Sequence, residues 1–478
     1  MSHYDYDLIV IGGGAAGLTA STGAGACGAK VLLIEKEKEL GGDCLHYGCV
    51  PSKSLIKSAY CYHVVRHSER YGLPQMDVPP IDFKNIRDRI RQIIGTIQVH
   101  DSPELIKKKY NVETRFGQPR FLDNHTITLN EVKLTARNFI IATGSSPAVP
   151  PIEGLNQITY LTNVNIFALE QLPVSLIVLG GGPIGLEMAQ AFARLGSKVT
   201  VIEALAQLLP KEDLDIAEFV KIKLELEGIR FELNSKAIKV QKESKMIKVT
   251  INQGNVFQDV VADALLVATG RKPNVDGLDL EKAGVDFDKR GIKVDGRLRT
   301  SVKNIFACGD VNGGYQFTHV AGYEAGIAMM NAVFPLIPLL HIPLRADYRH
   351  VPWCTYLDPE IASIGFNEQR AKAAHVEYVV HKEELKNNDR AKAEGETDGF
   401  IKILTNKAGK LIGVQIVGFH AGDLIHEWVA VFNGKVSLQT LGNAIHAYPT
   451  LAEINKTAAL NYFLKAPLGR KLRMILNV

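Results

Sequence analysis

The chain has 478 residues, of which 46% are hydrophobic and 22% charged, and its formal net charge is +4. This length favours about three domains of roughly 150 residues each, and so small a charge gives no argument for nucleic-acid binding. No uninterrupted apolar run reaches the roughly 20 residues that span a bilayer; the best candidate, residues 332–344, is broken by prolines and a histidine.

The start of the chain and its cysteines bear on its location. The first residues carry no basic leader, so we expect no signal peptide. The six cysteines stand at positions 27, 44, 49, 61, 308 and 354. Four of them have no obvious sequence partner, which favours a reducing cytoplasm over a disulfide scaffold.

Residues 6–11 are an apolar run that predicts a buried strand, and a glycine motif follows at once. The motif has the form Gly-x-Gly-x-x-Gly and consists of Gly12, Gly14 and Gly17. The first glycine allows a tight turn, the second lets the backbone approach a pyrophosphate, and the third lets helix and strand pack closely. A second strand, residues 31–34, ends at Glu35, which can accept hydrogen bonds from a ribose. This unit predicts a dinucleotide site.

Residues 41–53 read Gly-Gly-Asp-Cys-Leu-His-Tyr-Gly-Cys-Val-Pro-Ser-Lys. Cys44 and Cys49 therefore lie in a glycine-flanked turn at the start of a predicted helix, where they can pair or separate with little backbone movement. A structural disulfide would more often close a long loop of the unfolded chain. The segment predicts a redox-active dithiol.

The nucleotide-binding unit recurs in the middle of the chain. A strand over residues 175–179 leads into a second motif, made by Gly180, Gly182 and Gly185. Its second strand, residues 199–202, ends at Glu203, and the spacing from first glycine to acid is 23 positions in both copies (35 − 12 and 203 − 180). Because each copy has its strand, helix and acid, we expect two dinucleotide sites rather than glycine-rich turns in a plain α/β protein.

Further buried strands stop at small-residue turns that we expect beside a nucleotide. Residues 139–144 end at Thr143 and Gly144, and residues 265–271 end at Gly270 and Arg271. From residue 345 onward this pattern stops. Strand-like runs over residues 360–364, 400–404 and 411–419, with helical stretches, predict a separate α+β domain.

Together, from Gly12 to Glu453, these motifs resemble the FAD-dependent pyridine nucleotide-disulfide oxidoreductases. The resemblance implies an α/β fold with two Rossmann-like dinucleotide-binding domains and a C-terminal α+β dimerisation domain. The implied boundaries are 1–150 for the first part of the FAD domain, 151–270 for the NAD(P) domain, 271–344 for the return to the FAD or central domain, and 345–478 for dimerisation. It also implies a homodimer with active sites shared between subunits.

The resemblance assigns roles residue by residue. The cofactor-binding residues it implies are Gly12, Gly14, Gly17, Glu35, Gly42, Thr143, Gly144, Asp310, Gly180, Gly182, Gly185, Glu203, Gly270 and Arg271. Of these, Asp310 would hold the ribityl or pyrophosphate part of FAD. Lys53, paired with Glu187, would lie near flavin N5 and favour negative charge on the reduced ring. No resident metal is predicted.

The two cysteines receive different roles. Cys49 would be the thiolate that contacts the flavin, with its pKa lowered by the helix start, and Cys44 would be the thiol that meets substrate. Electrons would pass from a nicotinamide through FAD to the disulfide and on to an acceptor, or in reverse from a dithiol to NAD.

The second acid bears on the choice of nicotinamide. Glu203 would accept hydrogen bonds from a free 2′-hydroxyl and repel a 2′-phosphate. Residues 204–209 contain no Arg or Lys, which an NADP site usually supplies. The sequence therefore predicts NADH in preference to NADPH.

The C-terminal part departs from the common pattern. Many family members end in His-Pro-x-x-x-Glu, whose histidine serves as acid and base for the thiols. Here Glu453 is in place, but Tyr448 stands at the histidine position and His446 lies two residues earlier. A tyrosine, with an ordinary pKa near 10, is a poor base at neutral pH, although it can donate a hydrogen bond or help position a metal ion. This tyrosine resembles mercuric reductase; the alternative is a dihydrolipoamide dehydrogenase in which His446 serves as the base.

Other features leave the acceptor open. The typical mercuric reductase also has a C-terminal cysteine pair and often an N-terminal metal-binding domain. Here residues 470–478 contain no cysteine and the chain starts at its first strand, so we do not expect a full mercury detoxification role. The acceptor is expected to be a small or protein-bound disulfide, or a metal ion.

Three weaker expectations stand beside this one. A transhydrogenase or diaphorase that does not use the thiols, and a non-catalytic redox sensor that keeps FAD, are both disfavoured by the intact cysteine pair and nucleotide motifs. The basic and apolar tail, residues 464–478, could suggest contact with an anionic membrane surface. A surface or dimer-edge helix is the preferred interpretation of this tail, and we expect no membrane association.

Overall fold

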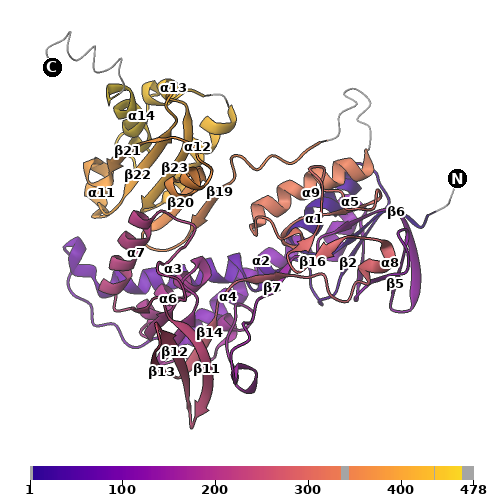
Figure 1. Ribbon diagram of the computed structural model, residues 1–478, viewed down its shortest axis with the longest axis horizontal. Helices are drawn as coiled ribbons and strands as arrows, with labels where there is room; N and C mark the ends of the chain where they lie inside the picture. The colour runs from indigo at the N-terminus through magenta and orange to yellow at the C-terminus, as the bar shows by residue number, and fades with distance from the viewer. Residues whose placement is uncertain (1–3, 335–343, 435, 466–478) are drawn as a thin grey trace.

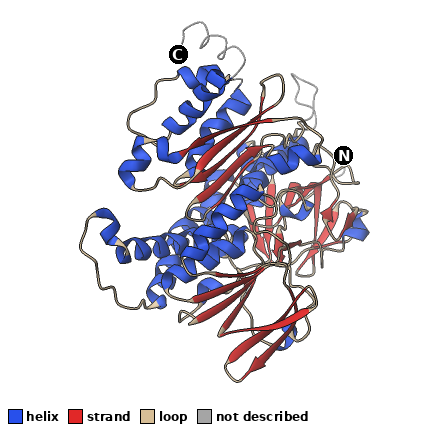
Figure 2. Ribbon diagram, turned by 60° about the vertical axis from the view of Figure 1, so that its left-hand side comes forward, coloured by secondary structure: helices blue, strands red, loops and turns tan. Residues whose placement is uncertain are grey.

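The computed structural model describes residues 4–334, 344–434 and 436–465. Figures 1 and 2 show a mixed α/β protein built of three sheet-containing parts with helices packed between them. Among the described residues no helix is long and apolar enough to cross a membrane. Residues 335–343 of the interrupted apolar stretch and residues 466–478 of the tail lie outside the described residues, so the expectations for them stay predictions.

The first part is a sheet with the strand order β3-β2-β1-β6-β5-β4, in which β18 also pairs with β6. Its parallel strands are β1 (Tyr6–Ile11), β2 (Val31–Glu35), β3 (Glu113–Phe116), β6 (Val132–Ile141) and β18 (Ile305–Ala307). Antiparallel strands β4 (Arg120–Phe121) and β5 (Thr126–Leu129) extend it. The parallel strands are apolar on both faces because both faces are covered. Helices α1 (Ala15–Ala26), α5 (Pro103–Tyr110) and α9 (Thr318–Val333) pack on one face, and strands β4 and β5 with the segment of residues 275–292 pack on the other.

The second part repeats this design on a smaller scale. Its parallel sheet has the order β10-β9-β8-β14 and consists of β8 (Ser175–Leu179), β9 (Lys198–Ile202), β10 (Arg230–Glu232) and β14 (Ala264–Val267). Its helices are α6 (Pro183–Leu195) and α7 (Leu214–Leu226). A three-stranded antiparallel sheet projects from it, made by β11 (Lys236–Glu243), β12 (Met246–Gln253) and β13 (Val256–Ala262).

Two long helices join these parts at the centre of the molecule. They are α3 (Cys49–Arg66), which follows the short α2 (Gly42–His46), and α4 (Phe83–Gln98). Helix α3 packs on α6, and Phe83 of α4 lies 5.7 Å from Phe192 of α6, measured between ring centroids. One hydrophobic core therefore includes residues of both nucleotide-binding units.

Short elements complete the central region. They are β7 (Ser145–Pro147) paired with β15 (Arg271–Pro273), β16 (Phe287–Asp288) paired with β17 (Gly291–Ile292), and α8 (Leu280–Ala283). Because β18 follows these and returns to the first sheet, the chain leaves the first part and comes back to it. The predicted boundaries at residues 150, 270 and 344 stay predictions.

The C-terminal part is a five-stranded antiparallel sheet with helices over it (Figure 1). In sheet order its strands are β19 (Pro352–Thr355), β20 (Glu360–Gly365), β23 (Leu411–Gly418), β22 (Phe400–Thr405) and β21 (Val379–Glu384). Its helices are α10 (Glu368–Ala373), α11 (Asp389–Glu394), α12 (Ala421–Gly434), α13 (Leu438–Asn443) and α14 (Glu453–Lys465). The three strands expected from the sequence match β20, β22 and β23, and the predicted fold class is confirmed.

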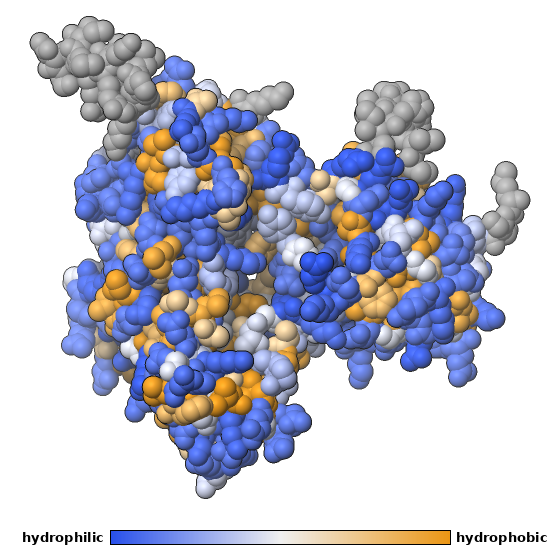
Figure 3. Space-filling model, in the orientation of Figure 1, coloured by the Kyte–Doolittle hydropathy of each residue, from blue (hydrophilic) through white to orange (hydrophobic). Residues whose placement is uncertain are grey.

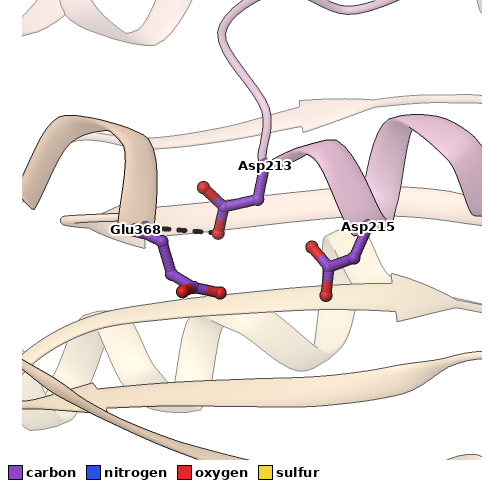
Figure 4. A group of neighbouring side chains, drawn as sticks. All are labelled: Asp213, Asp215 and Glu368. Atoms are coloured by element: carbon purple, nitrogen blue, oxygen red, sulfur yellow. Dashed lines mark hydrogen bonds between the residues drawn. The ribbon is translucent and has the colours of Figure 1, made fainter. Parts of the chain in front are cut away.

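A buried lysine connects the second part to the C-terminal sheet. The side chain of Lys402, on β22, is 1% exposed, and its Nζ lies 2.8 Å from Asp213, 2.9 Å from Asp215 and 2.8 Å from Glu368. Figure 4 shows these three carboxylates gathered around one point, with Glu368 N–H donating to Asp213. Their spacing would suit a metal ion, but the ammonium group of Lys402 is the cation that they bind.

Candidate active site

One cavity of about 2640 Å³ runs between the two nucleotide-binding parts, where the face shown in Figure 3 is hollowed. Both glycine motifs, both cysteines and the turns after β6 and β14 line it. Pockets for single small ligands usually measure about 300–1,000 Å³. This cavity therefore has room for more than one large ligand.

The first glycine motif has the geometry that close backbone contact requires. Gly12 has φ +108°, and a Cβ there would lie 2.4 Å from the carbonyl oxygen of Ala142. A Cβ on Gly17 would lie 1.7 Å from the carbonyl oxygen of Gly12. Glu35 braces the turn, since its Oε2 accepts a 2.6 Å hydrogen bond from the N–H of Gly13. Only glycine fits these positions, as the sequence motif predicts.

The second motif repeats this geometry closely. A Cβ on Gly180 would lie 2.5 Å from the carbonyl oxygen of Ala268, and one on Gly185 would lie 2.0 Å from that of Gly180. Glu203 accepts a 2.6 Å hydrogen bond from the N–H of Gly181. The two units therefore share one physical design.

The helices that start at these motifs leave their first amides available. Gly14 and Gly182 are the N-caps of α1 and α6, and neither helix has a side-chain cap. Uncapped N–H groups at a helix start, with the positive end of the helix dipole, suit a phosphate. Gly42 packs against the first turn, where a Cβ would lie 2.6 Å from the Cα of Gly14. These residues fit two dinucleotides, FAD and a nicotinamide.

The two cysteines differ in their acidity. Cys44 lies in α2 and Cys49 is the first residue of α3. A hydrogen bond from Cys44, with smaller contributions from Thr318 and Lys53, outweighs burial and lowers the pKa of Cys49 to about 6. The same hydrogen bond, together with burial, raises the pKa of Cys44. In the reduced pair Cys49 therefore carries the negative charge and Cys44 keeps a proton.

Lys53 and Glu187 are brought together as expected. Lys53 Nζ lies 2.8 Å from Glu187 Oε2, and the Glu187 side chain is 6% exposed. The N–H of Tyr356 donates to the other carboxylate oxygen at 2.9 Å, and Lys53 Nζ lies 4.3 Å from the centroid of the Tyr356 ring. The pair holds a cation at the edge of the cavity beside Cys49.

The turns after β6 and β14 meet at Asp310. Ser145 Oγ donates to Asp310 Oδ2 at 2.5 Å, and Arg271 Nε donates to Ser145 Oγ at 2.7 Å. Burial raises the pKa of Asp310, although Ser145 and Arg271 oppose the shift. Gly144 and Gly270 have φ values of +68° and +135°. Arg271 thus faces Asp310, in the part of the cavity where FAD is expected.

The turn at Asp310 is fixed to its neighbours by a hydroxyl and a carboxylate. Thr143 Oγ1 donates to the carbonyl of Asn274 at 2.7 Å. Buried Glu324 accepts a 2.7 Å hydrogen bond from the N–H of Gly309 and a 2.6 Å bond from the hydroxyl of Tyr348. Both contacts hold backbone next to predicted cofactor residues.

The C-terminal residues lie in another part of the chain. Tyr448 is 71% exposed, and its hydroxyl donates to Asp389 at 3.3 Å; the charge of Asp389 raises its pKa. His446 Nε2 lies 2.9 Å from Glu427, and the His446 side chain is 8% exposed. Glu453 accepts a hydrogen bond from the N–H of Thr450.

None of the three C-terminal candidates is among the described residues that line the cavity, and Figure 1 shows α14 well away from α2. The structure therefore does not bring Tyr448, His446 or Glu453 to the cysteines of the same chain. Completion of the site by a second subunit stays a prediction.

Sequence reasoning missed two residues that contact the redox turn. Thr318 Oγ1 lies 3.3 Å from Cys49 Sγ, and Asn163 Nδ2 donates to Asp43 at 3.0 Å. Thr318 is 269 positions from Cys49, so no local pattern could have indicated the contact. Asp43 directly precedes Cys44, and a carboxylate inside a redox turn was a signal available in the sequence.

Comparisons with known proteins agree with this arrangement. Residues 6–325 match the pyridine nucleotide-disulphide oxidoreductases, and residues 351–459 match the dimerisation domain of the same proteins, which supports a homodimer. The chain is 35% identical to dihydrolipoyl dehydrogenase of Bacillus subtilis over 462 residues, covering 95% of this chain and 98% of that protein. It is 34% identical to mercuric reductase of Staphylococcus aureus over 460 residues, covering 96% of this chain and 82% of that protein.

A solved structure is also similar along its whole length. It is the Cu(II) complex of the HOCl-induced flavoprotein disulfide reductase RclA from Escherichia coli, with a TM-score of 0.83 and 26% identity, covering 96% of this chain and 100% of that one. The family resemblance is thereby confirmed. The chain belongs to the pyridine nucleotide-disulphide oxidoreductase family, and is a flavoprotein enzyme that uses FAD and a nicotinamide nucleotide.

Proposed function

We propose that this enzyme takes electrons from NADH, passes them to the Cys44–Cys49 disulfide, and reduces a metal ion or a disulfide in the manner of a mercuric reductase. The observation that carries this proposal is the state of Tyr448. Its hydroxyl is bound to Asp389, whose charge raises its pKa, so it does not accept protons at neutral pH. Reduction of a metal ion needs no base to deprotonate the substrate, whereas oxidation of a dithiol does.

The residues of the cavity divide the chemistry between them. FAD, when bound, relays two electrons between the nicotinamide and the disulfide. Two electrons and one proton convert the disulfide to a Cys44 thiol and a Cys49 thiolate. Thr318 and Lys53 stabilise that thiolate. Transfer of both electrons to an acceptor restores the disulfide and releases the proton. The Lys53–Glu187 pair supplies a fixed positive charge beside this exchange.

The names of similar proteins support a metal-ion acceptor without deciding it. One relative is a mercuric reductase, and one similar structure holds Cu(II). Both features belong to those proteins. For this chain, Hg(II) and Cu(II) are the metal ions to test first.

Dihydrolipoamide dehydrogenase is the second candidate. His446 has a carboxylate partner, Glu427, at 2.9 Å, which is the pairing that a catalytic histidine needs. Relatives about 35% identical to this chain carry that name. Two observations argue against His446 as the base within a single chain. The His446 side chain is buried, and His446 is not among the described residues that line the cavity.

A reaction that does not use the thiols is the third candidate. A transhydrogenase or diaphorase would need the nucleotide sites but not Cys44 and Cys49. The pKa of Cys49 is lowered and that of Cys44 is raised, which is of use only to an enzyme that reacts through these thiols. This candidate therefore ranks last.

The preference for NADH rests on Glu203. Its Oε1 also accepts a 2.8 Å hydrogen bond from the N–H of Leu205, so its charge is held at the end of β9. A 2′-phosphate placed there would meet this carboxylate. We also propose a reducing compartment such as the cytoplasm, since the four cysteines outside the proposed redox pair have no obvious sequence partner.

The decisive experiment is anaerobic NADH oxidation by the purified holoenzyme with three acceptors: lipoamide, Hg(II) with excess thiol, and Cu(II). Metal-dependent turnover with little lipoamide activity supports the proposal. Fast lipoamide turnover that is lost in His446→Asn would establish the second candidate. Turnover that survives in Cys44→Ser would establish the third. NADPH in place of NADH tests the nicotinamide preference.

A further inference from the structure

The redox turn contains a carboxylate that the mechanism above does not use. Asp43 directly precedes Cys44, and its side chain is 35% exposed. Its Oδ2 lies 3.1 Å from Arg271 NH2, and its Oδ1 accepts a 3.0 Å hydrogen bond from Asn163 Nδ2. Asn163 Nδ2 also donates to the carbonyl of Tyr47 at 3.1 Å. Two residues from beyond position 150 therefore hold this turn.

Arg271 is itself firmly placed. Its side chain is 12% exposed, its NH2 donates to the carbonyl of Ser145 at 2.9 Å, and its Nε donates to Ser145 Oγ. On its other side it lies 3.8 Å from Asp310. Its backbone belongs to β15, which pairs with β7 and follows β14 and Gly270. The guanidinium is thus fixed between two carboxylates, one in the redox turn and one at the expected flavin site.

The charges around the thiols give this contact a chemical effect. Among the described residues, the largest effects on the Cys49 thiol come from Cys44, Thr318, Lys53 and Asp43, and the ring hydroxyl of Tyr356 also interacts with its charge. The charge of Asp43 works against a thiolate at Cys49. A guanidinium 3.1 Å from that carboxylate offsets part of its field.

We propose that Asp43 and Arg271 form a positioning pair for the dithiol, in which Arg271 fixes the redox turn and neutralises the carboxylate beside the cysteines. This rests on the proposed role of Cys44 and Cys49 as the redox pair. The pair connects the strand end after the second glycine motif directly to the turn that carries the thiols. Neither residue reacts; both act through Cys49.

Charge balance predicts a pattern that a purely structural contact would not give. Asp43→Asn leaves Arg271 unopposed and favours the thiolate, whereas Arg271→Gln leaves Asp43 unopposed and disfavours it. The double variant restores the balance. If the Asp43–Arg271 contact only stabilised the fold, both single variants would lose it. The half-maximal pH of Cys49 alkylation would then shift in the same direction in both.

The test measures the alkylation rate of Cys49 as a function of pH. The FAD-containing holoenzyme is reduced with dithiothreitol, desalted and treated with iodoacetamide between about pH 5 and pH 9, and the Cys49 peptide is quantified by mass spectrometry. We expect the half-maximal pH to fall by about 0.5–1 unit in Asp43→Asn, to rise by about the same amount in Arg271→Gln, and to return toward wild type in the double variant.

Two controls are matched to these variants. Lys272→Gln removes a neighbouring charge whose partner is the exposed Asp276, and should not move the Cys49 curve. Arg271→Lys keeps the charge, so its curve should lie much closer to wild type than that of Arg271→Gln. Shifts of the same sign in Asp43→Asn and Arg271→Gln, or no shift in either, would overturn the proposal.

The result can be read separately from the proposed function. If Arg271→Gln does not fold, Asp43→Asn still tests the proposal, because no shift or an upward shift in this variant overturns it. Because dithiothreitol reduces the dithiol in this assay, the pattern does not depend on NADH. Failure of NADH to expose the two thiols would count against the proposed function and leave the pair standing.

Discussion

Replacing Lys402 by methionine tests the contact that joins the second nucleotide-binding part to the C-terminal sheet. The substitution keeps the length and apolar stem of the side chain and removes only its charge. Three carboxylates, Asp213, Asp215 and Glu368, would then face one another without their cation. One oxygen atom from each carboxylate lies within 4.8 Å of those from the other two.

The expected loss of stability follows from these distances. At an effective dielectric constant of about 20, each contact at 2.8 Å corresponds to about 6 kcal/mol of Coulomb attraction, most of which desolvation offsets. Removing one partner of a buried ion pair costs about 3–5 kcal/mol. A domain is stable by only about 5–15 kcal/mol, so we expect a large decrease in the free energy of unfolding.

The pH dependence has a definite sign. Burial would lower the pKa of Lys402, but hydrogen bonds to Asp213, Glu368 and Asp215 outweigh it and raise the pKa. A group whose pKa is raised by folding stabilises the fold fully below its unfolded value, near 10.4, and loses this contribution as the pH rises through the folded value. The wild-type advantage over Lys402→Met is therefore present at pH 7 and should be lost only as the pH rises through the raised pKa of Lys402.

Urea unfolding followed by circular dichroism measures this difference. Lys407→Met is the control, because Lys407 and its partner Glu377 are exposed and such a pair is worth about 0–1 kcal/mol. Millimolar Ca²⁺ should restore part of the stability of Lys402→Met, since three carboxylate oxygens suit this ion, and should not affect the wild type. A loss in Lys402→Met no larger than in the control would refute the reasoning.

Three further predictions concern the active site. Thr318→Val removes the hydroxyl 3.3 Å from Cys49 Sγ and should raise the pKa of Cys49 by about one unit, measured by the pH dependence of alkylation; an unchanged curve would contradict the proposed role of the hydroxyl. Glu203→Gln removes the charge that a 2′-phosphate would meet, and should raise the ratio of kcat/KM for NADPH to that for NADH about tenfold; steady-state kinetics would show an unchanged ratio if another residue sets the preference. Tyr448→Phe should leave the pH profile of turnover unchanged between about pH 6 and pH 9. Asp389 raises the pKa of Tyr448, and an ionisation outside this range cannot shape the profile. Loss of either limb of the profile in this variant would show that Tyr448 titrates in the reaction.

The parts of the fold that the sequence predicts are those with local causes. A strand, a glycine turn, a helix and an acid lie within residues 6–35 of the first nucleotide-binding unit and residues 175–203 of the second, so the contacts between them are short in sequence. Glu35 and Glu203 accordingly brace their own glycine turns in the same way. The β11–β13 sheet, β19 and β21 carried no comparable signal and were not expected.

Contacts between distant segments set the limit of prediction. Lys402 and Asp213 are 189 positions apart, and Cys49 and Thr318 are 269 apart. Neither residue of such a pair has a pattern that indicates the other. The Lys53–Glu187 pair, 134 positions apart, was expected only because the family resemblance supplied it.

His446 shows how a correct residue type can have another partner. The sequence placed it two positions before Tyr448 with Glu453 as the nearby acid. In the structure its carboxylate partner is Glu427, on α12, and Glu453 instead accepts a hydrogen bond from the backbone of Thr450. Helix α12 supplies this acid, Glu427, which lies 19 positions before His446. Spacing along the chain therefore could not have indicated the pair.

The packing of α3 on α6 has a consequence for the rate of turnover. Each helix begins at the cavity, one at Cys49 and the other after the second glycine motif, and Lys53 and Glu187 join them four residues from each start. Since the two helices share one hydrophobic core, we expect packing to fix the separation between the proposed nicotinamide site and the thiols. Internal electron transfer should therefore be insensitive to solvent viscosity, and only the entry of the acceptor or the exit of the product should slow down in glycerol.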